Sequence, residues 1–159
     1  MSLSQRSATG LTARALALVG LLLSLCAFVA PAAQAAPTRP ASLDNTWACS
    51  VPAGYTYDQV QNNLNVCSPS NFAYSYHLRT PQDNIWACSV PTSNLTYDRV
   101  QDNLNVCSPS NFAYSYHLRI PVNGLWACSV PPGFSYDLTQ NNLNVCSPSN
   151  FAYSYRLRG

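Results

Sequence analysis

The chain has 159 residues and a formal net charge of +2, and its charged residues include no Lys and no Glu. Arg6 and Arg14 supply both positive units, so the chain beyond residue 35, with six Arg and six Asp, is formally neutral. Such a balance excludes strong electrostatic binding to nucleic acid or to an anionic membrane. The composition is that of a folded rather than a disordered protein.

Residues 1–35 have the pattern of a secretory signal peptide. A basic lead precedes an apolar run over residues 15–30, and small residues end the segment at Ala35, after which we predict cleavage. The expected location is secreted, either extracellular or periplasmic, with no stable membrane insertion after cleavage. A retained anchor is the alternative, but the apolar run is shorter than the roughly 20 residues that span a bilayer. Cys26 lacks the small preceding residue of a lipoprotein signal.

The rest of the chain is a tandem repeat. Residues 63–79 recur unchanged at 103–119, and residues 142–158 differ from them only by Arg156 in place of His77. The segments that we assign are an N-terminal lead at 36–45 and repeats at 46–80, 81–120 and 121–159. Recent duplication makes all positions alike, so identity between the repeats does not by itself mark functional residues.

Each repeat carries one pair of cysteines. The pairs are Cys49 and Cys67, Cys88 and Cys107, and Cys128 and Cys146. A duplicated unit most simply keeps its own bridge, and an exported chain meets an oxidising compartment, so we predict one disulfide within each repeat. Zinc is the rival, but it needs clustered Cys and His, and the third repeat has no His. We therefore expect no metal and no cofactor.

The first two elements of a repeat are a predicted strand and a predicted helix. The alternating residues 86–90 predict a short strand that ends at a proline. The stretch 56–64 begins with the spacing of a capping box, and its residues Tyr57, Val60 and Leu64 follow helical spacing. These features predict a short helix between the two cysteines.

The last element is an aromatic strand. Residues 72–79 alternate large apolar side chains with small or polar ones, which predicts a half-buried strand. Its buried face would carry Phe72, Tyr74, Tyr76 and Leu78.

These elements predict an α+β fold class, with three tandem disulfide-bridged repeats of strand, short helix and strand. One unit of about 40 residues buries too little core to stand alone, so we expect the repeats to pack together. The short links predict hairpins between the aromatic strand of one repeat and the Trp strand of the next. The two remaining strands could then pair and close a pseudo-three-fold ring.

Three units of about this length also resemble the layout of β-trefoil lectins, which often bridge cysteines within a unit. The resemblance implies an all-β, trefoil-like alternative. Those lectins carry Gln-x-Trp late in each unit, whereas Trp47 here precedes the first cysteine of its repeat. The predicted helix also leaves too little chain for four strands in a unit.

The sequence beyond residue 35 contains no recognisable catalytic set, so we predict that the protein is not an enzyme. All six of its cysteines have a partner. His77 and His117 occupy one repeat position, which Arg156 fills in the third repeat, so that position tolerates the loss of an imidazole. Asp58 and its equivalents lie at the predicted helix starts, where a stabilising role suffices.

Three kinds of residue are candidate ligand contacts. They are the loop residues Tyr55, Leu95 and Phe134, the strand-end residues Arg79, Arg119 and Arg158, and the tryptophans Trp47, Trp86 and Trp126. Loop residues often bind ligands, Arg suits a carboxylate or polar glycan, and Trp can stack on a sugar ring. The opposing interpretation is core packing for the Trp and a solvated strand end for the Arg.

Together these features predict a secreted, non-catalytic, multivalent binding module for an extracellular glycan or protein ligand at the cell surface. Three like sites on one body gain avidity without new contacts. The alternative is a secreted protease inhibitor or small toxin that uses the loops before each predicted helix.

Overall fold

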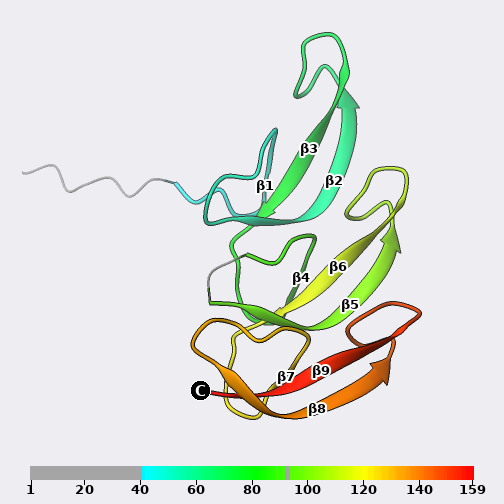
Figure 1. Cartoon of the computed structure of the whole chain (residues 1–159). Coiled ribbons are helices and arrows are strands. Elements are labelled where there is room, and N and C mark those ends of the chain that lie inside the picture. The colour runs from blue at the N-terminus through cyan, green and yellow to red at the C-terminus, as the bar shows by residue number, and fades with distance from the viewer. Residues whose placement is uncertain (1–40, 92–93) are drawn as a thin grey trace, which may run out of the picture. The chain divides into compact units, whose positions relative to one another are not determined.

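The computed structural model of the protein describes residues 41–91 and 94–159. The predicted signal peptide and residues 36–40 of the lead lie outside the described residues. The three repeats lie in one compact unit, Ala41–Gly159. Its described residues form nine strands and no helix (Figure 1).

Each repeat forms one three-stranded antiparallel sheet. The strands are β1 (Thr46–Ala48), β2 (Thr56–Leu64) and β3 (Phe72–Arg79), then β4 (Ile85–Ala87), β5 (Thr96–Leu104) and β6 (Phe112–Arg119), then β7 (Trp126–Ala127), β8 (Ser135–Leu143) and β9 (Phe151–Arg158). The strand orders are β1-β3-β2, β4-β6-β5 and β7-β9-β8, so the last strand of each repeat is central. Each sheet therefore has a short edge strand and a long edge strand.

The predicted α+β class is wrong, because the stretch taken for a helix is the long edge strand. A β-bulge explains the error: Tyr57 pairs with Leu78 and Gln59 with His77, with one extra residue between them. The extra residue gives Tyr57 and Val60 a separation of three while keeping both on one face of the strand. The bulge therefore reproduced the spacing of a helix in a segment of β-branched, aromatic and Asn residues, which favour strands or disfavour helices.

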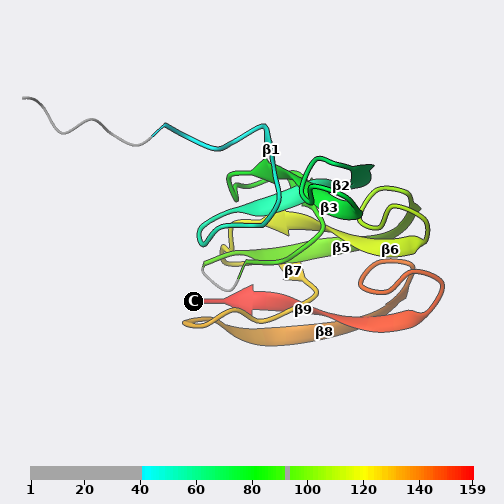
Figure 2. The same cartoon turned by 90° about the horizontal axis from the view of Figure 1, so that it is seen from above.

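The predicted hairpins between repeats, and the ring that they would close, are also wrong. Each short strand pairs with the aromatic strand of its own repeat, as β1 does with β3 and β4 with β6. The all-β class of the trefoil-like alternative agrees with the structure, although each repeat has three strands rather than four. The repeats follow one another in chain order (Figures 1 and 2).

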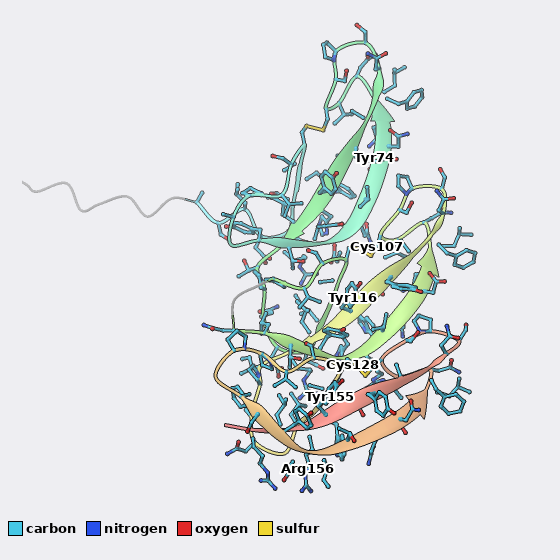
Figure 3. All side chains as sticks on the ribbon, viewed as in Figure 1. Tyr74, Cys107, Tyr116, Cys128, Tyr155 and Arg156 are labelled. Atoms are coloured by element: carbon cyan, nitrogen blue, oxygen red, sulfur yellow. A yellow bond between two sulfur atoms is a disulfide. The ribbon has the colours of Figure 1, made fainter. Side chains whose placement is uncertain are left out.

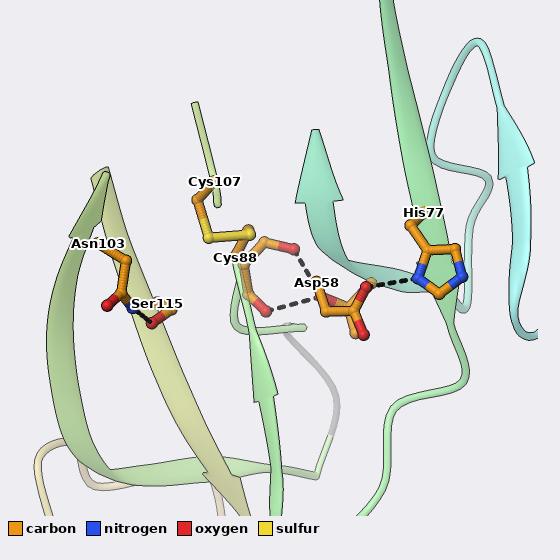
Figure 4. The surroundings of a disulfide bond; sticks show 8 residues. Asp58, His77, Cys88, Asn103, Cys107 and Ser115 are labelled. Atoms are coloured by element: carbon orange, nitrogen blue, oxygen red, sulfur yellow. Dashed lines mark hydrogen bonds and ion pairs between the residues drawn. A yellow bond between two sulfur atoms is a disulfide. The ribbon is translucent and has the colours of Figure 1, made fainter. Parts of the chain in front are cut away.

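The three predicted disulfides are confirmed. The bridges are Cys49–Cys67, Cys88–Cys107 and Cys128–Cys146. Each ties the end of the short strand to the loop between the two long strands. Figure 4 shows the second bridge beside β2 of the first repeat. The second and third bridges therefore lie at the boundaries between repeats as well as inside their own repeats.

Two backbone hydrogen bonds join each repeat to the next, and we call this contact the joint. In the first joint, the Cys88 N–H donates to the Tyr57 carbonyl at 2.7 Å, and the Val60 N–H donates to the Val106 carbonyl at 2.9 Å. The buried Thr56 hydroxyl adds a bond to the Ser89 carbonyl at 2.9 Å. The bridged segments of one repeat thus continue the free edge of the preceding sheet.

The second joint repeats the first. The Cys128 N–H donates to the Tyr97 carbonyl at 2.7 Å, and the Val100 N–H donates to the Val145 carbonyl at 2.8 Å. The two joints therefore use equivalent atoms.

The buried apolar core is small. Its members in the described residues are Val60, Leu78, Ala87, Val100, Leu118, Ala127 and Leu157. The two Val lie in the joints, the two Ala lie in short strands, and the three Leu lie on the central strands. Because so few side chains are buried, the disulfides and the joints must supply much of the stability.

Candidate functional site

The far end of each long hairpin carries exposed apolar side chains. In the first repeat Leu64, Phe72 and Tyr74 are 49%, 65% and 51% exposed. Leu64 pairs with Phe72, and Asn62 pairs with Tyr74, so these side chains share one face of the sheet. Equivalent residues in all three repeats form a set that we call the aromatic ladder: Leu64, Phe72, Tyr74, Leu104, Phe112, Tyr114, Leu143, Phe151 and Tyr153.

The ladder corrects the prediction that Phe72 and Tyr74 lie in the core. Both are on the same strand face as Leu78, which is fully buried, but burial declines along the strand. The short strand β1 reaches only from Leu78 to Tyr76, so beyond Tyr76 the central strand has no third strand beside it. The outer part of the hairpin therefore has two strands instead of three, and Tyr74 lies on this part (Figure 3).

The ladder recurs with nearly the same exposure in each repeat. Phe72, Phe112 and Phe151 are 65%, 65% and 67% exposed. A monomeric protein rarely exposes groups of large apolar side chains to water unless they form a binding site for a ligand or a partner. The ladder is thus the best candidate for a binding surface in the described residues.

Two equivalent grooves lie beside the ladder, where the hairpin of one repeat meets the loop of the next. The first has a volume of about 370 Å³, and its lining includes Asn62, Asn63, Phe72 and Asn105. The second, of about 390 Å³, is lined by Val100, Gln101, Asp102, Asn103, Asn144, Pro148 and Ser149. Side-chain amides offer both donors and acceptors, so each groove can bind a polar ligand, and in the first groove that ligand would lie next to the Phe72 ring.

The predicted tryptophan contacts lie on the other face of each sheet. Trp47 pairs with His77, and their ring centroids are 5.2 Å apart. Trp86 lies 5.1 Å from the ring of His117 in the same way. Trp47 is 42% exposed, whereas Trp86 is half-buried. The structure therefore does not bring the Trp together with the ladder.

The third tryptophan has a different neighbour. Trp126 pairs with Arg156, which replaces the histidine of the other repeats. Arg156 is labelled on the last sheet in Figure 3.

The predicted arginine contacts are engaged in ion pairs within the chain. Arg79 Nη1 lies 2.6 Å from Asp58 Oδ2, and the other oxygen of that carboxylate lies 2.6 Å from His77 Nδ1 (Figure 4). Arg119 repeats this contact with Asp98 at 2.7 Å. Asp58 is the extra residue of the bulge rather than a helix start, and its carboxylate holds two strand side chains in place.

In the third repeat, two arginines surround Asp137, which is the equivalent of Asp58. Arg156 and Arg158 both donate to the Asp137 carboxylate, and Arg156 contacts both of its oxygens at 2.8 Å. Arg158 could bind a ligand carboxylate only by sharing or losing this contact.

The predicted loop contacts are half-buried. The Tyr55 hydroxyl accepts a hydrogen bond from the Leu43 N–H at 3.0 Å. The Phe134 ring lies against the C-terminal Gly159. Leu95 is also half-buried and lines a separate groove of about 430 Å³ with residues of the link between the first two repeats. These three residues do not form a common surface with the ladder.

We expect acid to destabilise the fold through two carboxylates. Hydrogen bonds from Arg156 and then Arg158 hold the pKa of Asp137 far below its usual value. The Ile120 N–H and the Arg119 side chain lower the pKa of Asp83. A carboxyl group with a lower pKa in the folded state contributes stability above its unfolded pKa, and that contribution is lost as the pH falls through the folded pKa. The melting temperature should therefore hold down to about pH 5 and fall below about pH 4.

Thermal unfolding followed by circular dichroism across this range tests the expectation. The double variant Asp83→Asn, Asp137→Asn should have a lower melting temperature than the wild type at neutral pH. Its melting temperature should fall less than that of the wild type when the pH is lowered. Asp102→Asn is the matched control, because Asp102 forms no ion pair with any residue in 41–91 or 94–159. Equal acid sensitivity in the double variant and the wild type would contradict the assignment.

No protein-family model matches the sequence, and neither a curated protein nor a solved structure matches it. Function must therefore be argued from the surface itself. Within the described ranges, no group of three His, Cys, Asp or Glu side chains could hold a metal ion. No helix there has the length and hydropathy needed to cross a membrane.

Sequence reasoning missed Leu64 and Phe72 as candidate contacts. The signal that could have found them is their position on either side of the loop at residues 65–71, which is rich in Asn, Ser and Pro. Apolar residues that flank a polar turn lie at the end of a hairpin, where a short neighbouring strand cannot cover them.

Proposed function

We propose that the protein is a non-catalytic extracellular module that binds glycans through the aromatic ladder. The observation that carries the proposal is the recurrence of exposed Leu, Phe and Tyr side chains at the same place in all three repeats. Three disulfides within the chain favour an oxidising compartment. Residues 1–35 supply the predicted export signal.

The ladder and the grooves suit the two surfaces of a sugar ring. A pyranose has an apolar face of C–H groups, which an exposed ring such as Phe72 or Tyr74 can cover and remove from water. It also has a rim of hydroxyl groups, which the amides of Asn62 and Asn105 in the groove can bind. The combination favours a neutral glycan, in keeping with the neutral repeats.

The repetition favours a polymeric glycan over a single sugar. One ladder unit offers only a few shallow contacts, so its affinity for a monosaccharide should be low. A chain that contacts the units of successive repeats binds the second and third intramolecularly, which raises the overall avidity. We therefore expect polysaccharides to bind and their monomers to compete poorly.

The triple variant Phe72→Ala, Phe112→Ala, Phe151→Ala tests the proposal. If each ring contributes about 1 kcal/mol, loss of all three should weaken polysaccharide binding about a hundredfold. Affinity electrophoresis through gels that contain a panel of neutral polysaccharides measures the effect.

The matched control replaces exposed apolar residues outside the ladder. Ile120 and Val122 are 52% and 53% exposed in a link between repeats, and their change to Ala should leave retardation in the gel unchanged. Absence of binding across the panel, or equal loss in the ladder and control variants, would reject the proposal. Protease inhibition by the loops before the long strands has less support, because Tyr55 and Phe134 are half-buried.

A further inference from the structure

The two joints inside the chain are built from two unlike surfaces. The first is the outer edge of a long strand, which we call the edge face: in the first repeat it comprises Thr56, Tyr57 and Val60. The second is the bridged segment that covers it, which we call the bridge face: in the second repeat it comprises Cys88, Ser89 and Val106. Thr56 and Val60 are 0% and 6% exposed, so the joint covers the edge face thoroughly.

The edge face of the third repeat is not covered by any of the described residues. Ser135, Tyr136 and Thr139 are all exposed, and Tyr136 is 52% exposed. Thr139 pairs with Tyr155 in the register by which Val60 pairs with Tyr76, so its N–H points away from β9 as that of Val60 points away from β3. Beyond the β8–β9 pairing, neither the Thr139 N–H nor the Tyr136 carbonyl has a backbone partner in the described residues.

The first repeat begins with a bridge face that is likewise uncovered by described residues. Cys49 and Ser50 are exposed, and Val66 is 61% exposed, whereas the equivalent Val106 and Val145 are half-buried in the joints. The residues of this face are the same as those in the other two repeats. The two ends of the repeat array therefore present the two halves of one interface.

The sequence of the last edge face preserves the fit. Ser135 keeps the hydroxyl of Thr56, Tyr136 keeps the aromatic ring, and Thr139 has nearly the shape of Val60. Proteins usually protect a free edge strand with charge, proline or short length, and repeat arrays usually end in a polar cap. β8 is nine residues long, and it carries Leu138, which is 47% exposed, where the other repeats have Gln59 and Arg99.

We propose that a second copy of this chain docks its bridge face on the free edge face, so that molecules join head to tail. The Cys49 N–H of one copy would donate to the Tyr136 carbonyl of the other, and the Thr139 N–H would donate to the Val66 carbonyl. An interface between unlike faces leaves a free face at each end, so it generates filaments or rings rather than closed dimers. The ladder would then continue from one copy to the next.

Sedimentation velocity on the processed, oxidised protein tests the proposal. The wild type should form a concentration-dependent series of oligomers. Thr139→Asp and Val66→Asp each place an unpaired charge in one half of the interface, so each variant alone should sediment as a monomer. Gln82→Glu adds the same charge to an exposed link residue and should assemble as the wild type does.

An equal mixture of the two blocked variants separates head-to-tail joining from other self-association. The Val66→Asp chain keeps its edge face, and the Thr139→Asp chain keeps its bridge face, so the mixture should form a dimer and nothing larger. A wild type that stays monomeric at every soluble concentration would overturn the proposal, and so would oligomers that persist in either variant. The triple Phe→Ala ladder variant should still assemble, so assembly and glycan binding can fail independently.

Discussion

Replacing Cys88 and Cys107 by Ala should destabilise the protein by more than replacing Cys49 and Cys67 by Ala. Closing a loop of about 18 residues contributes about 3 kcal/mol in the chain-entropy model, and this part is common to all three bridges. The second bridge also holds the Cys88 N–H against the Tyr57 carbonyl and the Val106 carbonyl against the Val60 N–H. Its removal therefore loosens the first joint as well as its own repeat.

The first bridge is the matched comparison. Cys49 and Cys67 close a loop of nearly the same length, with separations of 18 and 19 residues in the two repeats. The bridge face to which they belong covers no other repeat. Cys49→Ala, Cys67→Ala should therefore cost about 3 kcal/mol, and Cys88→Ala, Cys107→Ala should cost more.

Urea unfolding of the three proteins measures the difference. The wild type and both variants are compared at one dilute concentration, so that association does not contribute. If only the Cys88→Ala, Cys107→Ala variant is already unfolded without urea, that result still shows that the second bridge contributes more stability than the first. Equal midpoints and slopes for the two variants would show that the bridges do not support the joints.

The repeats and the disulfide pairing could be predicted because they depend only on the spacing of equivalent residues along the chain. The steps between equivalent residues fix the repeat, and a duplicated pair of cysteines has a simple partner. The long edge strand could not be recognised, because the bulge between Tyr57 and Gln59 shifts the alternation by one residue. One extra residue in a strand places two side chains of the same face three positions apart, which is also the spacing of a helix over a segment of this length.

The ladder could not be predicted for a different reason. Alternation along a strand shows which side chains share a face, but it does not show what covers that face. Here the exposure on one face of β3 rises from Leu78 to Phe72, although Ser75 on the opposite face is buried, and the alternation of the sequence carries no sign of this gradient. Leu78 and Phe72 share a face, yet one is fully buried and the other is 65% exposed.

The joints also could not be predicted from the sequence, because they consist mainly of hydrogen bonds between backbone groups. Their hydrogen bonds involve residues such as Tyr57 and Cys88, whose side chains give no sign of the contact. A strand edge can be covered either by a hairpin partner or by a loop of the next repeat, and both satisfy the same N–H and C=O groups. This ambiguity led to the incorrect hairpins and ring.

Val100→Asp should be among the most damaging single substitutions in the protein. Val100 is 6% exposed in the second joint, where its N–H donates to the Val145 carbonyl. A carboxylate there would be largely buried, in a groove whose lining includes Asp102 and no basic side chain. An uncompensated buried charge costs about 3 kcal/mol or more, so the loss should exceed that of Val100→Thr, which buries only a hydroxyl and should cost about 1 kcal/mol.

Thr139→Asp is the same change at the equivalent position of the third repeat. Because Thr139 is exposed at the free edge of β8, its carboxylate would stay in water, and the free energy of unfolding should change by less than about 0.5 kcal/mol. Urea unfolding at a concentration where the chain is monomeric gives both values. A loss for Thr139→Asp as large as that for Val100→Asp would mean that the monomer already covers this edge. A large loss for Val100→Asp and a small one for Thr139→Asp would instead show that the edge face is covered in the second repeat and exposed to solvent in the third.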